Sequence, residues 1–272
     1  MTVSPDIPPA AGRPRSTKRR FASGRAIAAL MLREMSTRYG RSPGGYVWAI
    51  AEPLGALVFM AFAFSLLLRT PSLGNSFILF YASGFLPFQV MAQVETAVTG
   101  ALRFSRPLLM YPAVSWFDAI AARFLLNFLT SVTVMIIVLA GILQFTDTTV
   151  VLEFGPMIEA TILAAFLGLG LGTLNAVLTG LYPVWGSFYG ILNRPRIIYA
   201  GVIFIYEDLS GIVQDIIWYI PFVHITGLFR DGVYPTYSPQ YISELLVLTW
   251  AVVTLFFGLL LMRRFRQDIL MR

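Results

Sequence analysis

The chain of 272 residues contains no cysteine, one histidine and one lysine. Without cysteine it can form no disulfide, no cysteine-ligated metal site and no thiol nucleophile. His224 alone cannot build a histidine metal cluster or a catalytic relay, so we expect neither a metal site nor catalytic residues. The lysine, Lys18, lies in no G-x-x-x-x-G-K-[ST] phosphate loop, so we expect this chain not to bind or hydrolyse ATP by itself.

Charged residues are also scarce, and apolar residues are in excess. Charged side chains make up 12% of the chain and hydrophobic ones 57%, whereas ordinary soluble domains carry about 25% charged residues. A membrane-spanning helix needs about 20 mostly apolar residues, and six runs meet that need. The sequence therefore predicts an all-α membrane protein with six transmembrane helices, at about residues 45–68, 77–100, 117–143, 156–181, 187–206 and 242–262.

The residues before the first run are too polar to cross a membrane. Residues 1–22 are rich in proline and then basic, with no apolar core of signal-peptide length. We interpret them as a flexible basic cytoplasmic arm. Over residues 25–40, apolar side chains recur at helical spacing, which predicts an amphipathic interfacial helix on the membrane surface. A surface helix of a small soluble lobe is the alternative.

The segment between the last two runs, residues 207–240, mixes short apolar pieces with polar residues. Asp215 and Pro221 interrupt these pieces, which are too short to cross the membrane. A re-entrant helical hairpin, shielded by protein at depth, is predicted before the last span. An interfacial loop is the alternative.

Arginines are distributed unevenly between the two sides of the predicted spans. They gather in the N-terminal arm, after the second run, near Arg194 and Arg196, and in the C-terminal tail, while acidic residues prevail in the opposite loops. The positive-inside rule then places both termini in the cytoplasm of a multi-pass inner-membrane protein. Topology accounts for the net charge of +6, so we expect no nucleic-acid partner.

Four carboxylates fall within the predicted spans: Glu52, Glu95, Asp118 and Glu159. We expect Glu95 and Asp118 near the cytoplasmic ends, Glu159 near the outer end and Glu52 deeper in the first span. A carboxylate inside a membrane indicates a functional site. A helix cap, or pairing with Arg41 or Arg123, is the alternative for Glu52.

Residues 33–54, REMSTRYGRSPGGYVWAIAEPL, resemble the first segment of type 2 ABC exporter permeases, and among these the capsular-polysaccharide export permeases most closely. The pattern R-[YF]-G-R…G-[YF]-x-W-x-x-x-E-P is filled by Arg38, Tyr39, Gly40, Arg41, Gly45, Tyr46, Trp48, Glu52 and Pro53. Residues 106–114 resemble that family's loop between spans two and three. Residues 220–235 resemble its N-P-x-x-H-x-x-E-x-x-R passage, with Ile220 and Gly227 replacing the asparagine and the acid.

The resemblance covers nearly the whole chain and implies a function. Residues 23–272 would be the transmembrane domain of an exporter that moves a lipid-linked capsular or other cell-surface polysaccharide across the bacterial inner membrane. Two copies would form the pore as a homodimer. A separate cytoplasmic ABC ATPase would use ATP and Mg, so this chain itself would bind no cofactor. Periplasmic and outer-membrane polysaccharide export proteins are the further partners expected.

The same resemblance implies roles for particular residues. Arg106, Leu108, Leu109 and Tyr111 would couple the permease to a groove in the ATPase. Aromatic rings suit the apolar faces and hydroxyls of sugars, and arginines suit an anionic lipid phosphate or acidic sugar. The pathway candidates are Arg38, Arg41, Tyr46, Trp48, Glu52, Trp116, Tyr182, Trp185 and Tyr189. An aromatic belt at the membrane interface is the alternative role for the rings.

Three other functions are consistent with parts of the sequence. The exporter could carry O-antigen, teichoic acid, a lipid or a drug instead of capsule. A membrane-embedded glycosyl- or acyltransferase would need clustered carboxylates or a histidine near a loop, and the sequence has one histidine and scattered acids. An ion-coupled secondary transporter would favour paired broken spans with buried charges, which the sequence does not indicate clearly.

Overall fold

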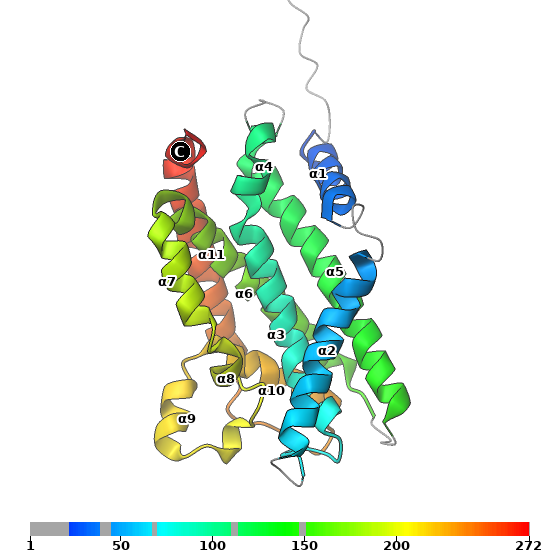
Figure 1. The fold of residues 1–272 in the computed structure, drawn as a ribbon. Coiled ribbons are helices and arrows are strands. Elements are labelled where there is room, and N and C mark those ends of the chain that lie inside the picture. Colours follow the sequence, from blue (N-terminus) through cyan, green and yellow to red (C-terminus); the bar gives the residue numbers. More distant parts are fainter. Residues whose placement is uncertain (1–21, 39–44, 67–69, 110–113, 147–150, 272) are drawn as a thin grey trace, which may run out of the picture.

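A computed structural model describes residues 22–38, 45–66, 70–109, 114–146 and 151–271. All the regular secondary structure in these ranges is helical, and the helices are joined by loops. The described residues form no strand, which confirms the all-α prediction (Figure 1). The helices are α1 Ala22–Arg38, α2 Gly45–Ser65, α3 Phe77–Thr99, α4 Ala101–Leu109, α5 Trp116–Phe145, α6 Phe154–Leu181, α7 Pro183–Asn193, α8 Arg196–Tyr199, α9 Gly211–Ile217, α10 Pro221–Val233 and α11 Glu244–Met271. A short 3₁₀ turn covers Tyr206–Asp208.

Five helices in the described ranges are long and apolar enough to cross a membrane: α2, α3 with α4, α5, α6 and α11. They match the predicted spans at 45–68, 77–100, 117–143, 156–181 and 242–262 to within a few residues at most ends. The last helix extends past its predicted end, because Arg263, Arg264 and Arg266 continue it in helical form to Met271. Helix α1 covers most of the predicted interfacial helix.

The predicted continuous span at 187–206 is wrong. Helix α7 begins earlier, at Pro183, and ends at Asn193, and only the short α8 follows before a non-helical stretch. Pro195 lacks an amide hydrogen for helix continuation. Gly201 has a φ of +74°, a left-handed conformation that side chains other than glycine rarely adopt. The high apolar content of this run predicts a span, but these helix breakers prevent one continuous helix.

The carbonyl groups released by this break are bound by a buried arginine. Arg230, on α10, donates hydrogen bonds to the carbonyl oxygens of Phe204, at 2.7 Å, and Val202, at 2.8 Å. Its guanidinium lies 4.4 Å from the centre of the Phe80 ring, and Arg230 is only 2% exposed. Non-helical backbone is tolerated at membrane depth where protein groups satisfy it, and Arg230 does so here.

The chain bends by 102° between α9 and α10. Counted together as one bent span, they would raise the number of candidate spans to six. His224 fixes the start of α10, because one ring nitrogen lies 2.7 Å from the Trp218 carbonyl and the other accepts from the Ser243 amide at 3.1 Å. Gly227, the position where the family pattern has an acid, leaves room for the Tyr241 hydroxyl, which would lie 2.1 Å from an added Cβ.

The core of the bundle is the close contact of α3 with α6. A Cβ added at Gly168 would lie 2.6 Å from the Met91 carbonyl oxygen, and one at Gly172 would lie 2.8 Å from the Glu95 carbonyl oxygen. The contact of α6 with α11 is equally close, because a Cβ added at Gly170 would lie 2.5 Å from the Ala251 carbonyl oxygen. Small residues let membrane helices approach at backbone distance, so these glycines set the spacing of α3, α6 and α11.

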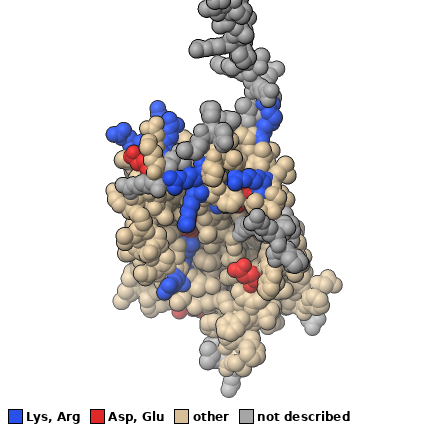
Figure 2. All heavy atoms as spheres, turned by 45° about the horizontal axis from the view of Figure 1, so that its top comes forward, with Lys and Arg blue, Asp and Glu red and all other residues tan. Residues whose placement is uncertain are grey.

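One end of the bundle carries α1, α4 and the C-terminal end of α11, and α9 lies at the opposite end (Figure 1). Exposed arginines gather at the first of these ends, which we call the basic end. They are Arg25, Arg103, Arg106, Arg263, Arg264 and Arg266. Figure 2, which tilts this end toward the viewer, shows the concentration of basic side chains there.

We predict that Gly168→Ala destabilises the folded protein by about 1–3 kcal/mol, because the added methyl group overpacks the α3–α6 contact. Gly155→Ala, in the same helix, is the matched control, since no atom lies within 4 Å of its added Cβ. Thermal unfolding of the detergent-solubilised protein measures both. Equal melting temperatures for the two variants would show that the α3–α6 contact at Gly168 does not limit the stability of the protein.

Candidate functional site

A cavity of about 290 Å³, lined by both polar and apolar side chains, lies between α2, α3 and α5. Each helix contributes polar or aromatic side chains at helical spacing: Trp48 and Glu52 from α2, Gln89 and Gln93 from α3, and Asn127, Thr130 and Ser131 from α5. Residues four apart lie on one helix face, so three polar stripes converge on one space inside an otherwise apolar bundle. Polar residues at membrane depth usually line a route or a site.

Glu52 and Trp48 lie at the open side of this cavity. Glu52 is exposed in the single chain, and Trp48 is 68% exposed. The described contacts do not join Glu52 to Arg123, the arginine suggested from sequence. Arg123 instead forms an ion pair with Glu34 of α1 at 3.1 Å and donates to the Ala97 carbonyl oxygen at 3.0 Å.

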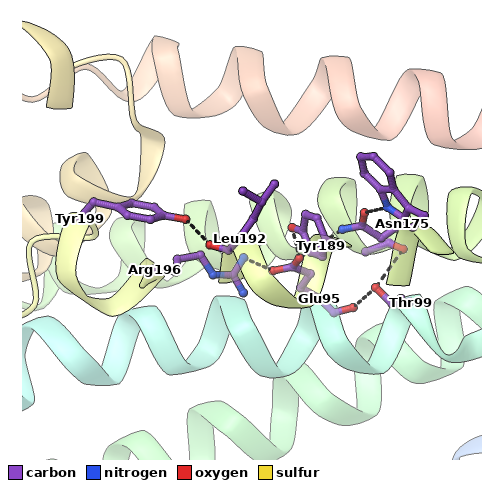
Figure 3. Close-up of polar contacts among 9 residues, drawn as sticks. Glu95, Thr99, Asn175, Tyr189, Leu192, Arg196 and Tyr199 are labelled. Atoms are coloured by element: carbon purple, nitrogen blue, oxygen red, sulfur yellow. Dashed lines mark hydrogen bonds and ion pairs between the residues drawn. The ribbon is translucent and has the colours of Figure 1, made fainter. Parts of the chain in front are cut away.

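A second polar cluster, which we call the Glu95 cluster, joins α3, α6, α7 and α8 (Figure 3). The Glu95 carboxylate accepts hydrogen bonds from Tyr189 and from Asn175, the latter at 3.3 Å, and it pairs with Arg196 at 2.5 Å. The Asn175 oxygen accepts from the Trp185 ring nitrogen at 2.9 Å. The carboxylate and the guanidinium are both buried, so each partner neutralises the other's charge away from water.

The predicted pathway residues fall into separate places rather than one surface of the chain. Trp48 and Glu52 lie at the cavity, and Trp185 and Tyr189 belong to the Glu95 cluster. Two further candidates lie apart: Tyr182, which is 64% exposed at the turn between α6 and α7, and Trp116, whose ring meets Phe117 edge-on at the start of α5. Arg41 lies outside the described residues, as do the side chains of Arg38 and Tyr46.

Three of the four predicted coupling residues, Arg106, Leu108 and Leu109, lie on α4, at the basic end. Arg106 is exposed, and Leu108 and Leu109 are half-buried; Tyr111 lies outside the described residues. Phe104 of α4 is covered by the guanidinium groups of Arg33 and Arg123, whose carbon atoms lie 5.4 and 4.2 Å from the ring centre. Helix α4 is therefore held against α1 and α5 on one side and exposes Arg106 on the other.

Several residues of the cavity and of the Glu95 cluster were not predicted from the sequence. Arg196 was expected in a cytoplasmic segment, but the structure buries it against Glu95, because the break after Asn193 turns α8 inward. Gln89, Gln93, Asn127, Thr130 and Ser131 were not singled out. Their spacing of four, or of three and four, within apolar runs was a usable signal. The pairing of Glu95 with a residue 101 positions later had no sequence signal.

We predict that the cavity is accessible to water. Since the chain lacks cysteine, Ser131→Cys places a single thiol in the cavity. Leu129→Cys places a single thiol on the outer, apolar side of the same helix, where Leu129 is 54% exposed. A thiol must ionise to react, so a water-soluble maleimide should label Ser131→Cys in membranes and leave Leu129→Cys largely unlabelled. Equal labelling of the two would contradict a water-filled cavity.

Comparison with known proteins gives a consistent result. Residues 25–234 match the family described as ABC-2 type transporter. The chain is 28% identical over 237 residues to the polysialic acid transport protein KpsM of Escherichia coli, covering 87% of this chain and 92% of that protein. It is 26% identical to the capsule polysaccharide export inner-membrane protein CtrC of Neisseria meningitidis serogroup B, and 24% identical to BexB of Haemophilus influenzae, which bears the same description. Each match covers 90% of this chain and 92% or 93% of the relative. With the helical membrane fold described above, the match shows that the chain belongs to the ABC-2 type transporter family.

Proposed function

We propose that this chain is the permease subunit of an ATP-driven exporter that moves a lipid-linked capsular or other cell-surface polysaccharide across the bacterial inner membrane. The observation that carries the proposal is the extent of the similarity. Three relatives named for export of polysialic acid or capsule match 87% to 90% of this chain and at least 92% of their own length. The similarity therefore extends over most of the chain rather than over one short segment.

The basic end of the bundle is the cytoplasmic end in this proposal. Basic residues are retained on the cytoplasmic side of bacterial inner-membrane proteins. The start of α1 and the end of α11 both lie there (Figure 1), so both termini are cytoplasmic. Helix α1 then lies along the inner membrane surface, and α9 and α10 form a re-entrant hairpin at the outer surface. The pairing of Glu34 with Arg123 supports the first of these placements by fastening α1 across the end of α5.

The energy source is a separate ATPase subunit that binds at α4. The chain has no phosphate loop of its own, so ATP and Mg belong to that partner. Leu108 and Leu109 supply apolar anchors at the basic end, and Arg106 supplies an exposed charge beside them. Buried anchors provide most of the energy of an interface, and charges at its rim mainly steer association.

The cavity fits a route for a hydrated sugar chain. Amide, hydroxyl and carboxylate groups can exchange hydrogen bonds with sugar hydroxyls, and the Trp48 ring can stack on a sugar face. Helix α2 is the least buried of the five long spans and carries the exposed Glu52. A charge facing lipid is unfavourable, so a second copy of the chain covers this side in a homodimeric pore. Periplasmic and outer-membrane export proteins complete the route.

We predict that Leu108→Ala combined with Leu109→Ala weakens binding of the cognate ATPase. Loss of one large buried anchor typically costs about 2 kcal/mol, which corresponds to roughly a thirtyfold loss of affinity. Co-purification of the ATPase and surface polysaccharide should both fall, while the abundance of the permease is unchanged. Ile212→Ala, a substitution of an exposed residue on α9 at the opposite end, is the control. Normal ATPase binding by the double variant would remove α4 as the coupling element.

We also predict the sidedness of the chain. Reporter domains fused after Arg106 and after Met271 should be active in the cytoplasm, because both positions lie at the basic end. Reporters fused after Ser72 and after Tyr237 should be active in the periplasm. A periplasmic signal from the fusion after Met271 would contradict the assigned orientation.

A further inference from the structure

Helix α7 lacks the buried apolar face that normally holds a helix in a bundle. None of its residues, all of which the structure describes, is buried. Its large apolar side chains point outward instead: Val184 is 79% exposed, Ile191 62% and Phe188 50%. Apolar packing within the chain therefore contributes little to the position of α7.

Polar contacts that converge on one carboxylate hold α7 to the rest of the chain, whereas α8 also packs Ile197 against the apolar core. Glu95 of α3 accepts from Tyr189 on α7 and pairs with Arg196 on α8. Trp185 on α7 donates to Asn175 of α6, which itself donates to Glu95 (Figure 3). Two rings of α7, one guanidinium of α8 and the facing helices are thus joined through the same side chain.

The segment has a backbone break at each end. Tyr182 is extended, with φ −127° and ψ 97°, and Pro183 begins α7 immediately after it. At the other end, α7 stops at Asn193, and Pro195, which has no amide hydrogen, cannot continue its hydrogen bonds. Such positions at the ends of helices absorb backbone rotation when a rigid segment moves. The helix between them can therefore change position without unfolding.

The Glu95 cluster is incompletely satisfied. The Arg196 Nε atom is buried and has no hydrogen-bond partner among the described residues. Its guanidinium carbon lies 5.3 Å from the Phe222 ring centre and 5.7 Å from that of Phe88. A buried polar network with an unpaired member is less stable than a complete one. The cluster therefore holds the segment in place by contacts that can be broken.

We propose that α7 is a movable segment of the permease that swings about Tyr182 and the break before α8, and that Glu95 is the latch that holds it in the position seen here. The motion serves the transport cycle and so rests on the proposed function. Glu95 is then a positioning residue, which acts on the pathway candidates Trp185 and Tyr189 rather than on the cargo.

A reversible crosslink tests whether the segment must move. A Cβ added at Gly186 of α7 would lie 3.4 Å from the Thr179 Cγ2 atom of α6, which is close enough for a disulfide between two introduced cysteines. The parent chain has no cysteine, so Thr179→Cys with Gly186→Cys gives one defined bond across the Tyr182 turn. The two single variants are the controls.

The complex of this variant with its cognate ATPase should lose export and cargo-dependent ATP hydrolysis when oxidised, and recover both on reduction. The single variants should be insensitive to oxidant. Equal activity of the oxidised and reduced double variant would overturn the proposal, since a clamped α7 would then be sufficient for transport.

A distance measurement tests the latch without any requirement for transport. Spin labels at Ile191→Cys on α7 and Ile162→Cys on α6, both exposed sites, report the separation of the two helices in lipid nanodiscs. Glu95→Gln keeps an acceptor oxygen but removes the charge opposite Arg196. Glu34→Gln does the same at the Arg123 pair, which joins α1 to α5, and is the matched control.

Glu95→Gln should add a second population of distances, and Glu34→Gln should leave the parent distribution unchanged. An unchanged distribution in Glu95→Gln, or the same change in both variants, would overturn the latch. The measurement uses the permease alone, so it separates this proposal from the proposed function, which fails instead if no ATPase binds.

Discussion

A polar group inside an apolar bundle has to find its partner within the protein, because lipid offers none. This constraint organises the interior of the molecule. The non-helical stretch after α8 leaves backbone carbonyls without helical partners, and Arg230 binds two of them. The buried Glu95 and Arg196 satisfy each other across α3 and α8. Between α2, α3 and α5, where polar side chains of three helices face one another, the structure has a cavity.

Helix α3 separates the two polar regions by its geometry. Gln89 and Gln93 are four residues apart and face the cavity, while Glu95 comes two residues after Gln93. Two helical residues correspond to a rotation of about 200°, so Glu95 points away from the cavity and toward α6. The close approach of α3 to α6 at Gly168 and Gly172 then brings Asn175 within reach of that carboxylate. One helix thereby lines the cavity on one face and supports a buried ion pair on the other.

The sequence was sufficient for the features that depend on local composition. Five long apolar runs became five long helices, and the capping box of Ser115 and Asp118 explains why α5 begins where it does. The fifth run was misread because its apolar content outweighed Pro195 and Gly201, whose effect depends on neighbours that can satisfy a broken helix. Arg230 provides those hydrogen bonds from a distance of 26 and 28 residues. Contacts of that kind, including the pairing of Glu95 with Arg196, depend on tertiary packing and leave no periodic signal.

Arg123, on α5, links three other helices at the basic end. Its guanidinium pairs with Glu34 of α1, donates to the carbonyl of Ala97 in the last turns of α3, and lies over Phe104 of α4. A movement of any one of these three helices is therefore transmitted to the other two through the Arg123 side chain of α5. A substitution at this position would loosen three elements at once, so the site has little mutational freedom, whereas sequence changes that leave these contacts intact can accumulate along the outer faces of the same helices.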